Sequence, residues 1–294
     1  MRTRAATPLL FILAAAVLWS TGGLFIKWVK LGGLELSFWR SLFAIFTVAF
    51  FTRREGFRLN SLTAVASVLY AVLLILFVSA TKATTAANAI FLQYTSSVYL
   101  LILEPLIYKE KFRSRDLVTV LVCVGGMSLF FMGQVRTQDV KGNIFALLSG
   151  LCFALYFLLL RHPRAREVNR ASSVIYGNTL AVILTAPWGL ASLSLMTRLD
   201  LIGAIYLGVV QLGISYTLFT VGMARGVRSL DAGIVCYVEP LLNPLWVFLI
   251  LGEKPSAWAL LGGAIIIAAV ITHMLLDARG KRRAKAVAFE AAHG

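Results

Sequence analysis

The sequence predicts an all-α integral membrane protein that crosses the bilayer about ten times, in two halves of inverted topology. Of the 294 residues, 59% are hydrophobic and only 14% are charged, and the mean hydropathy is +0.84. Soluble domains are only about half apolar. Apolar runs of about 20 residues, the length that crosses a bilayer core, recur along the whole chain. In addition, one sequence segment occurs twice, and an odd number of such apolar runs separates its two copies.

The predicted spans follow one another with short connections that leave no room for a soluble domain. In chain order they are 7–28, 35–52, 61–81, 85–108, 115–133, 142–160, 171–193, 199–223, 229–252 and 256–276. The first span follows Arg2 and Arg4, as a signal peptide would. It is longer than a signal-peptide core, continues to Lys27 and Lys30, and offers no convincing cleavage site, so we expect it to be retained.

The basic residues lie between the spans rather than along one soluble face, although the net charge is +15. Alternate connections, counted with the termini, hold 20 Lys and Arg on one side and 7 on the other, and Arg40 lies within the second span. By the positive-inside rule, this asymmetry places both termini in the cytoplasm. The basic tail is expected to contact anionic lipid, and nucleic-acid binding is disfavoured.

Two segments, LIYKEKFRSRDLV and LILGEKPSAWALL, align at a constant offset of 143 residues. The coincident positions include Glu110/Glu253, Lys111/Lys254 and, farther upstream, Tyr94/Tyr237. Because an odd number of spans separates the two copies, the two Glu-Lys pairs are predicted on opposite sides of the membrane. Inverted repeats recur in secondary transporters, whose halves exchange conformations to open a midplane site to each side in turn. Some channels share this symmetry.

The stretch YVEPLLNPLWVFLILGEKPSAWALLGGAIIIAAV and the sixth span, GNIFALLSGLCFALYFLLLR, resemble the EamA family of the drug/metabolite transporter superfamily. The resemblance covers nearly the whole chain and extends to YddG-type exporters of aromatic amino acids. It implies a multi-pass protein of the bacterial inner membrane, with ten helices around a central cavity. It also implies a first five-helix repeat at 1–134, a second at 135–278, and a basic cytoplasmic tail at 279–294.

Glu239 is the deepest predicted carboxylate. It lies 14 residues before Glu253, or about 21 Å along a helix that rises 1.5 Å per residue. A charge at this depth is disfavoured unless it is paired or hydrated. Glu239 therefore either faces a wet cavity and binds an amine or a proton, or only locks the ninth helix. In the second case it is protonated, or it pairs with Arg40 or with a free backbone donor. Asn243 and Trp246 share its helix face.

Two prolines interrupt the same span. Pro240 and Pro244 lack the N–H groups that would bond the carbonyls of Cys236 and Pro240, which favours a bend and calls for polar partners at those carbonyls. The stripe of carboxylate, amide and indole therefore indicates a cavity wall. The alternative is a kinked packing helix with Trp246 at the outer interface.

Further candidates for substrate contact are polar or aromatic residues of other spans. They are Trp19, Gln93, Tyr99, Tyr156, Gln211 and Ser215. Taken singly, each aromatic residue favours helix packing over ligand contact. With Glu239, Asn243 and Trp246, these residues form the predicted substrate-binding set, and we expect no catalytic residue, no metal ligand and no cofactor.

The sequence also disfavours several function classes. It lacks the G-x-x-x-x-G-K-[ST] loop of ATP-driven pumps, the H-E-x-x-H pair of a metalloenzyme, and the charged ring or filter loop of a channel. Multiply anionic cargo is disfavoured because Arg40 is the only basic residue deep within a span.

The expected function is export of small amphipathic metabolites by alternating access. The resemblance makes amino acids the first candidate substrates, and drug-like cations or other metabolites are the alternative. The expected partners are this small-molecule substrate and membrane lipid, with a monomer as the expected state. The sequence leaves open which substrate is carried, which ion is coupled and in which direction net flux runs.

Overall fold

The computed structural model describes residues 8–109, 111–130, 132, 139–169, 171–251 and 257–293, and these residues form helices and connections without a strand. The α-helices are α1 (Pro8–Trp19), α2 (Gly22–Trp28), α3 (Gly33–Thr52), α4 (Ser61–Ala83), α5 (Ala86–Gln93), α6 (Ser96–Tyr108), α7 (Ser114–Phe130), α8 (Val140–Arg161), α9 (Ser172–Ala191), α10 (Arg198–Tyr206), α11 (Ser215–Ala224), α12 (Ser229–Val235), α13 (Val238–Leu251) and α14 (Ala257–His293). A π-helical segment, Leu207–Ile214, joins α10 to α11. The predicted all-α fold is confirmed.

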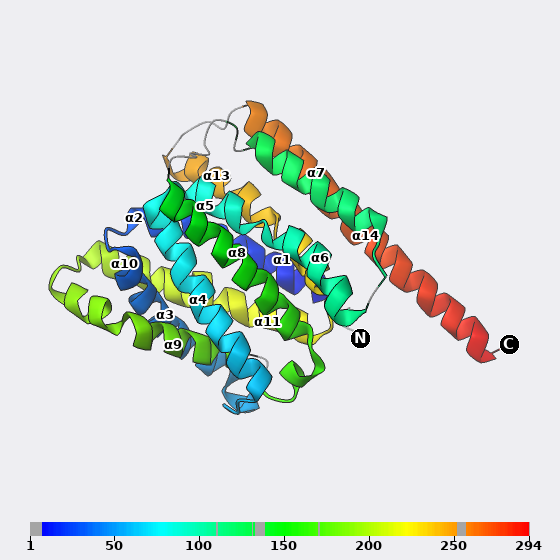
Figure 1. The fold of residues 1–294 in the computed structure, drawn as a ribbon, viewed down its shortest axis with the longest axis horizontal. Coiled ribbons are helices and arrows are strands. Elements are labelled where there is room, and N and C mark those ends of the chain that lie inside the picture. The colour runs from blue at the N-terminus through cyan, green and yellow to red at the C-terminus, as the bar shows by residue number, and fades with distance from the viewer. Residues whose placement is uncertain are drawn as a thin grey trace.

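Among the described residues, seven stretches are long and apolar enough to cross a membrane. They are Pro8–Trp28, Gly33–Glu55, Ser61–Ala83, Asn88–Tyr108, Val140–Arg161, Ser172–Ser194 and Arg198–Ala224. The other three expected spans correspond to α7, to α12 with α13, and to the first part of α14. Helix α14 also continues past the predicted end of its span, because it includes residues up to His293. In Figure 1 it extends well beyond the rest of the bundle.

Three of the expected spans are interrupted near their middle. The breaks lie at Ser20–Thr21 between α1 and α2, at Tyr94–Thr95 between α5 and α6, and at Cys236–Tyr237 between α12 and α13. The last break is the one predicted from Pro240, which cannot donate to the Cys236 carbonyl. No break follows at the second proline, since α13 runs through Pro244 to Leu251.

The inverted repeat is visible in where the helices begin and in how they pack. Helices α5 and α12 begin 143 residues apart, as do α7 and α14, and the breaks at Tyr94 and Tyr237 have the same spacing. Helix α4 packs on α8 as α1 packs on α11, and α3 pairs with α9 as α7 pairs with α14. The α7–α14 pair lies at one edge of the bundle (Figure 1).

Some predicted features of the repeat fall outside the described residues. These are the boundary between repeats at 134/135, together with Glu110, Glu253 and Lys254. The repeat limits 1–134 and 135–278 therefore stay a prediction.

The connections gather at two ends of the bundle, as an alternating topology requires. At the end richer in Lys and Arg, called here the basic end, the Asn60 side chain donates to the Arg164 carbonyl at 2.7 Å. Ser172 donates there to the Arg58 carbonyl at 2.8 Å. At the opposite end, Lys82 donates to the Val29 carbonyl at 2.5 Å and the Lys30 N–H donates to Asp200 at 2.7 Å. The connections of both halves thus tie each end together.

Candidate functional site

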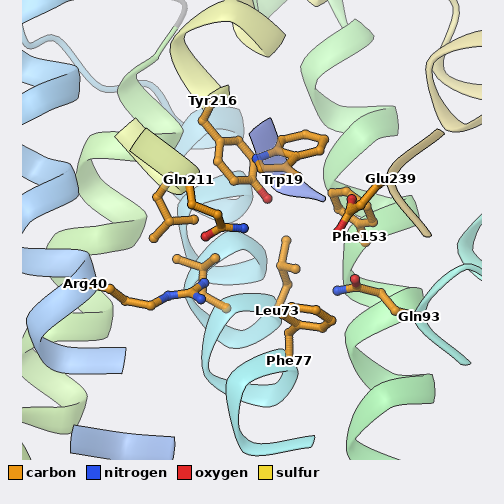
Figure 2. A pocket seen from close by; sticks show the side chains of 11 residues that line it. Trp19, Arg40, Leu73, Phe77, Gln93, Phe153, Gln211, Tyr216 and Glu239 are labelled. Atoms are coloured by element: carbon orange, nitrogen blue, oxygen red, sulfur yellow. The ribbon is translucent and has the colours of Figure 1, made fainter. Parts of the chain in front are cut away.

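A small cavity lies between the helices of the two halves, beside all three helix breaks (Figure 2). Its volume is about 20 Å³, which is room for about one water molecule. Its lining combines aromatic and aliphatic walls with a few polar groups. The lining residues are Trp19, Arg40, Leu73, Leu74, Phe77, Gln93, Phe153, Gln211, Leu212, Tyr216 and Glu239.

The helix breaks place three of the polar or amphipathic lining residues. Trp19 is the last residue of α1, Gln93 is the last residue of α5, and Glu239 is the second residue of α13. Backbone groups at such breaks have lost their helical partners and need polar ones. Broken helices at the interface of inverted repeats are the usual place of a transporter's substrate site. The cavity therefore has the position expected of such a site.

Glu239 faces this cavity and is 6% exposed. Its Oε2 atom lies 2.8 Å from the Tyr94 hydroxyl, which is also 2.5 Å from the Cys236 carbonyl. Because the phenol has one proton, it donates fully to only one of these two oxygens at a time. Pro240 has no N–H to give the Cys236 carbonyl, which accepts instead from the Glu239 N–H at 2.9 Å. Within the described residues Glu239 has no ion pair, and the predicted alternative of a bond to Arg40 is absent. One carboxylate thus retains unused capacity to accept hydrogen bonds.

Arg40 enters from α3 on the opposite side of the cavity (Figure 2). It is 1% exposed, and its Nε and Nη1 atoms have no hydrogen-bond partner among the described residues. Its backbone is fixed by close packing, since a Cβ added to Gly208 of the π-helical segment would lie 2.5 Å from the Arg40 carbonyl oxygen. Only a glycine allows that approach.

Two amides complete the polar lining. Gln93 donates to the Ser149 hydroxyl at 2.8 Å, and this hydroxyl lies 3.2 Å from the Leu73 carbonyl. Gln211 lies in the π-helical segment, and its Oε1 atom has no partner among the residues described. π-Helical turns occur often at functional sites. The first amide is therefore held in place, whereas the second has a free acceptor.

Aromatic rings form the wall beside these groups. The Trp19 ring lies 4.7 Å from that of Tyr216, 5.2 Å from that of Phe219 and 6.0 Å from that of Phe153. Such rings give a bound molecule a large apolar contact area.

Four of the predicted substrate-contact residues, Trp19, Gln93, Gln211 and Glu239, come together in this cavity. Asn243 and Trp246 lie farther along α13, against the break between α1 and α2. The Trp246 indole donates to the Ser20 hydroxyl at 2.7 Å. Asn243 faces Gly23, where an added Cβ would be 2.7 Å from its amide nitrogen.

The remaining predicted residues do not line the cavity. Tyr156 pairs with Ser173 at 3.1 Å and packs on the ring of Tyr70. Ser215 bonds the Gln211 and Leu212 carbonyls of its own helix. Tyr99 is partly buried against the apolar core. Their part in substrate binding stays a prediction.

Several lining residues were missing from the predicted set, namely Arg40, Phe77, Phe153 and Tyr216. For Arg40 there was a signal, because it is the single basic residue deep within a span. Tyr94, which contacts Glu239, also had a sequence signal, since it aligns with Tyr237 in the repeat. For the phenylalanines the sequence offers no such mark among so many apolar neighbours. Among the described residues, no group of three or more His, Cys, Asp or Glu side chains is placed to hold a metal ion.

Comparison with known proteins gives matches along most of the chain. A model of the EamA-like transporter family matches residues 6–132 and again residues 140–275. An uncharacterized transporter of Archaeoglobus fulgidus is 28% identical over 88% of this chain and 93% of its own length. The uncharacterized transporter YwfM of Bacillus subtilis is 29% identical over 65% of this chain and 63% of its own. One protein of known crystal structure superposes with a TM-score of 0.75 at 19% identity, covering 92% of this chain and 97% of the other.

Proposed function

Because the chain belongs to the EamA-like transporter family of the drug/metabolite transporter superfamily, we propose that it exports small amphipathic metabolites, amino acids foremost, across the bacterial inner membrane by alternating access. The observation that carries this proposal is the cavity to which both halves contribute. Trp19 and Arg40 come from the first half, and Gln211 and Glu239 come from the second. Alternating access needs a site that two similar halves share.

The chemistry of the lining supports an amphipathic cargo. Trp19, Phe153 and Tyr216 offer aromatic contact area, and Gln93 and Glu239 offer hydrogen-bond partners. The carboxylate of Glu239 suits an amine. The same carboxylate favours a second candidate cargo, drug-like cations.

The size of the cavity indicates how transport must proceed. A volume of about 20 Å³ holds about one water molecule and is too small for an amino acid. The bundle must widen before substrate enters. The breaks beside Trp19, Gln93 and Glu239 are the places where the backbone can bend with least loss of helical hydrogen bonds.

Flux into and out of liposomes tests the proposal. The purified protein should catalyse saturable uptake and counterflow of at least one member of a panel of amino acids, nucleosides and organic cations. Flux that does not saturate and shows no counterflow would indicate a channel. Saturable flux of organic cations alone would favour the second candidate over amino acids.

Substitution of Glu239 tests the site. Glu239→Gln keeps the size and most of the hydrogen bonding of the side chain, and we expect folded protein whose transport is lost or no longer depends on pH. Glu167→Gln, at an exposed carboxylate, is the matched control. Wild-type rates and an unchanged pH profile in Glu239→Gln would make Glu239 a polar lock of α13.

The aromatic candidates outside the cavity have their own test. We expect Trp246→Ala and Tyr99→Ala to lower transport more than they lower the amount of folded protein. Equal losses of both would assign these rings to helix packing.

Orientation in the membrane is part of the proposal, and it follows from the excess of Lys and Arg at the basic end. In a background without Cys123, Cys152 and Cys236, cysteines replacing Arg113 and Arg166 should react with an impermeant thiol reagent only from the cytoplasm. A cysteine replacing the exposed Arg198 at the other end should react only from outside. Labelling of Arg166→Cys and Arg198→Cys from one side would contradict the inverted topology.

A further inference from the structure

The depth and isolation of Arg40 need an explanation. Arg40 is the eighth residue of the 20-residue helix α3, and its side chain is 1% exposed. A guanidinium at such depth in a membrane is strongly disfavoured unless something compensates its charge. Nevertheless, its Nε and Nη1 atoms have no hydrogen-bond partner, and no carboxylate lies within ion-pair distance among the described residues.

Two other arginines of the described residues, the partly buried Arg161 and the buried Arg228, are compensated. Arg161 lies 2.7 Å from Glu104, and Arg228 lies 3.2 Å from Glu104 and 2.7 Å from Asp116. These two guanidinium groups are therefore paired with carboxylates where they close the basic end. Arg40, which lines the cavity, has no such partner among the described residues.

The geometry of the cavity indicates what could serve as the partner. Arg40 points into the cavity from one side, and Glu239 and Gln93 lie on the other side, with Gln211 beside the gap (Figure 2). A guanidinium presents a planar fork of donors that matches a carboxylate. A doubly charged phosphate ester fits poorly, because Arg40 is the only cation among the lining residues and Glu239 would repel it.

We infer that Arg40 is the carboxylate subsite of the transport site, so that the cargo is a zwitterion held between Arg40 and Glu239. This inference rests on the proposed function. The carboxylate of the cargo bonds to Arg40, its ammonium group bonds to Glu239, and its apolar part contacts Trp19 and Phe153. The cargo class is therefore amino acids or similar zwitterions, and a cation that lacks a carboxylate satisfies only half of the site.

The test compares phenylalanine with 2-phenylethylamine, which is phenylalanine without its carboxylate. In counterflow experiments with wild-type protein in liposomes, phenylalanine should compete at a concentration at least about tenfold lower than that of 2-phenylethylamine. In Arg40→Gln, the apparent KM for phenylalanine should rise about tenfold or more, and the preference over the amine should disappear. Arg40→Lys keeps the charge but not the fork, so a weaker preference should remain.

A stability measurement separates this role from a structural one. An unpaired buried charge disfavours the folded state, so Arg40→Gln should unfold at the same temperature as the wild type or at a higher one. The matched control is Arg53→Gln, at the exposed end of the same helix, where the cation lies over the ring of Phe50. It should leave KM and preference unchanged.

The outcomes are distinguishable. If wild-type protein transports no member of the panel, the proposed function and this inference both fail. If it transports organic cations but no amino acid, the second candidate function stands and this inference fails. If it transports amino acids but Arg40→Gln and Arg40→Lys keep the wild-type KM and preference, only this inference fails. A lower unfolding temperature in Arg40→Gln with unchanged KM would make Arg40 a structural residue.

Discussion

Glu104-Pro105 and Glu239-Pro240 are the same dipeptide in two buried places, yet their carboxylates have different partners. Glu104 Oε1 accepts from Arg161 at 2.7 Å and from the Ser229 N–H at 2.8 Å. Glu104 Oε2 accepts from the Leu230 N–H at 3.1 Å and lies 3.2 Å from Arg228 Nε. Glu239 has one side-chain hydrogen-bond partner among the described residues, the Tyr94 hydroxyl at 2.8 Å.

The difference teaches that the partners, rather than the motif, decide what a buried carboxylate does. Glu104 joins α6 of the first half to the first turn of α12 in the second half, and so it holds the basic end closed. Arg228 extends this network, since burial opposes its charge but the carboxylates of Glu104, Asp116 and Asp231 raise its pKa above the ordinary value. Among the described residues Glu239 has no ion pair, as its proposed contact with a cargo requires.

The largest expected effect is that of Glu104→Gln. This change removes the carboxylate that Arg161 and Arg228 share, although Arg228 keeps Asp116 and Asp231. It should lower the free energy of unfolding by about 3–5 kcal/mol. Thermal unfolding of purified protein measures the loss, with the exposed Glu167→Gln as control, expected within about 0.5 kcal/mol of wild type. An unchanged unfolding temperature in Glu104→Gln would mean that Glu104 contributes no more to stability than Glu239 is expected to.

The second effect is the coupling between Glu104 and Arg161. Once Arg161→Gln has removed one partner, Glu104→Gln should cost less than it does alone, with an interaction energy of about 1–3 kcal/mol in a double-mutant cycle. Strict additivity of the two substitutions would mean that the 2.7 Å contact between them contributes nothing to stability.

A smaller effect is expected where the two broken helices cross. Tyr94→Phe takes a donor from the buried Cys236 carbonyl and from Glu239, and should cost about 1–2 kcal/mol. Tyr237→Phe removes a weaker bond, because the Tyr237 hydroxyl lies 3.5 Å from the Tyr94 carbonyl. Equal losses in the two variants would show that the equivalent tyrosines are also energetically equivalent.

The smallest effect is expected on the stability of Glu239→Gln. An amide oxygen can still accept from Tyr94, so the free energy of unfolding should change by less than about 1 kcal/mol. A loss as large as that of Glu104→Gln would assign both carboxylates to structure.

These expectations depend on contacts of which the sequence predicted only some. Composition and periodicity predicted the helical membrane fold, and the repeat offset marked Tyr94 and Tyr237 as equivalent. Pro240 predicted that the Cys236 carbonyl lacks its usual bond to the N–H four residues on, because the missing N–H is a property of that residue alone. Glu239 was predicted at depth by counting residues along its helix.

The partners were harder to predict. Arg161 and Arg228 reach Glu104 from connections 57 and 124 residues away, and no local pattern encodes that meeting. The sequence also could not predict which face of each helix points to the cavity, since all faces of an apolar span have a similar composition. Tyr156 was therefore predicted to contact substrate and Phe153 was not, although Phe153 is the one of the two that lines the cavity.

The small volume of the cavity has a consequence for the energy supply of the cell. A space of about 20 Å³ holds about one water molecule, so we expect it to interrupt any file of water molecules through the described conformation. A membrane that contains many copies of this protein at rest should then keep its electrical insulation. Liposomes that carry the protein without substrate should accordingly hold a potassium diffusion potential as long as protein-free liposomes do.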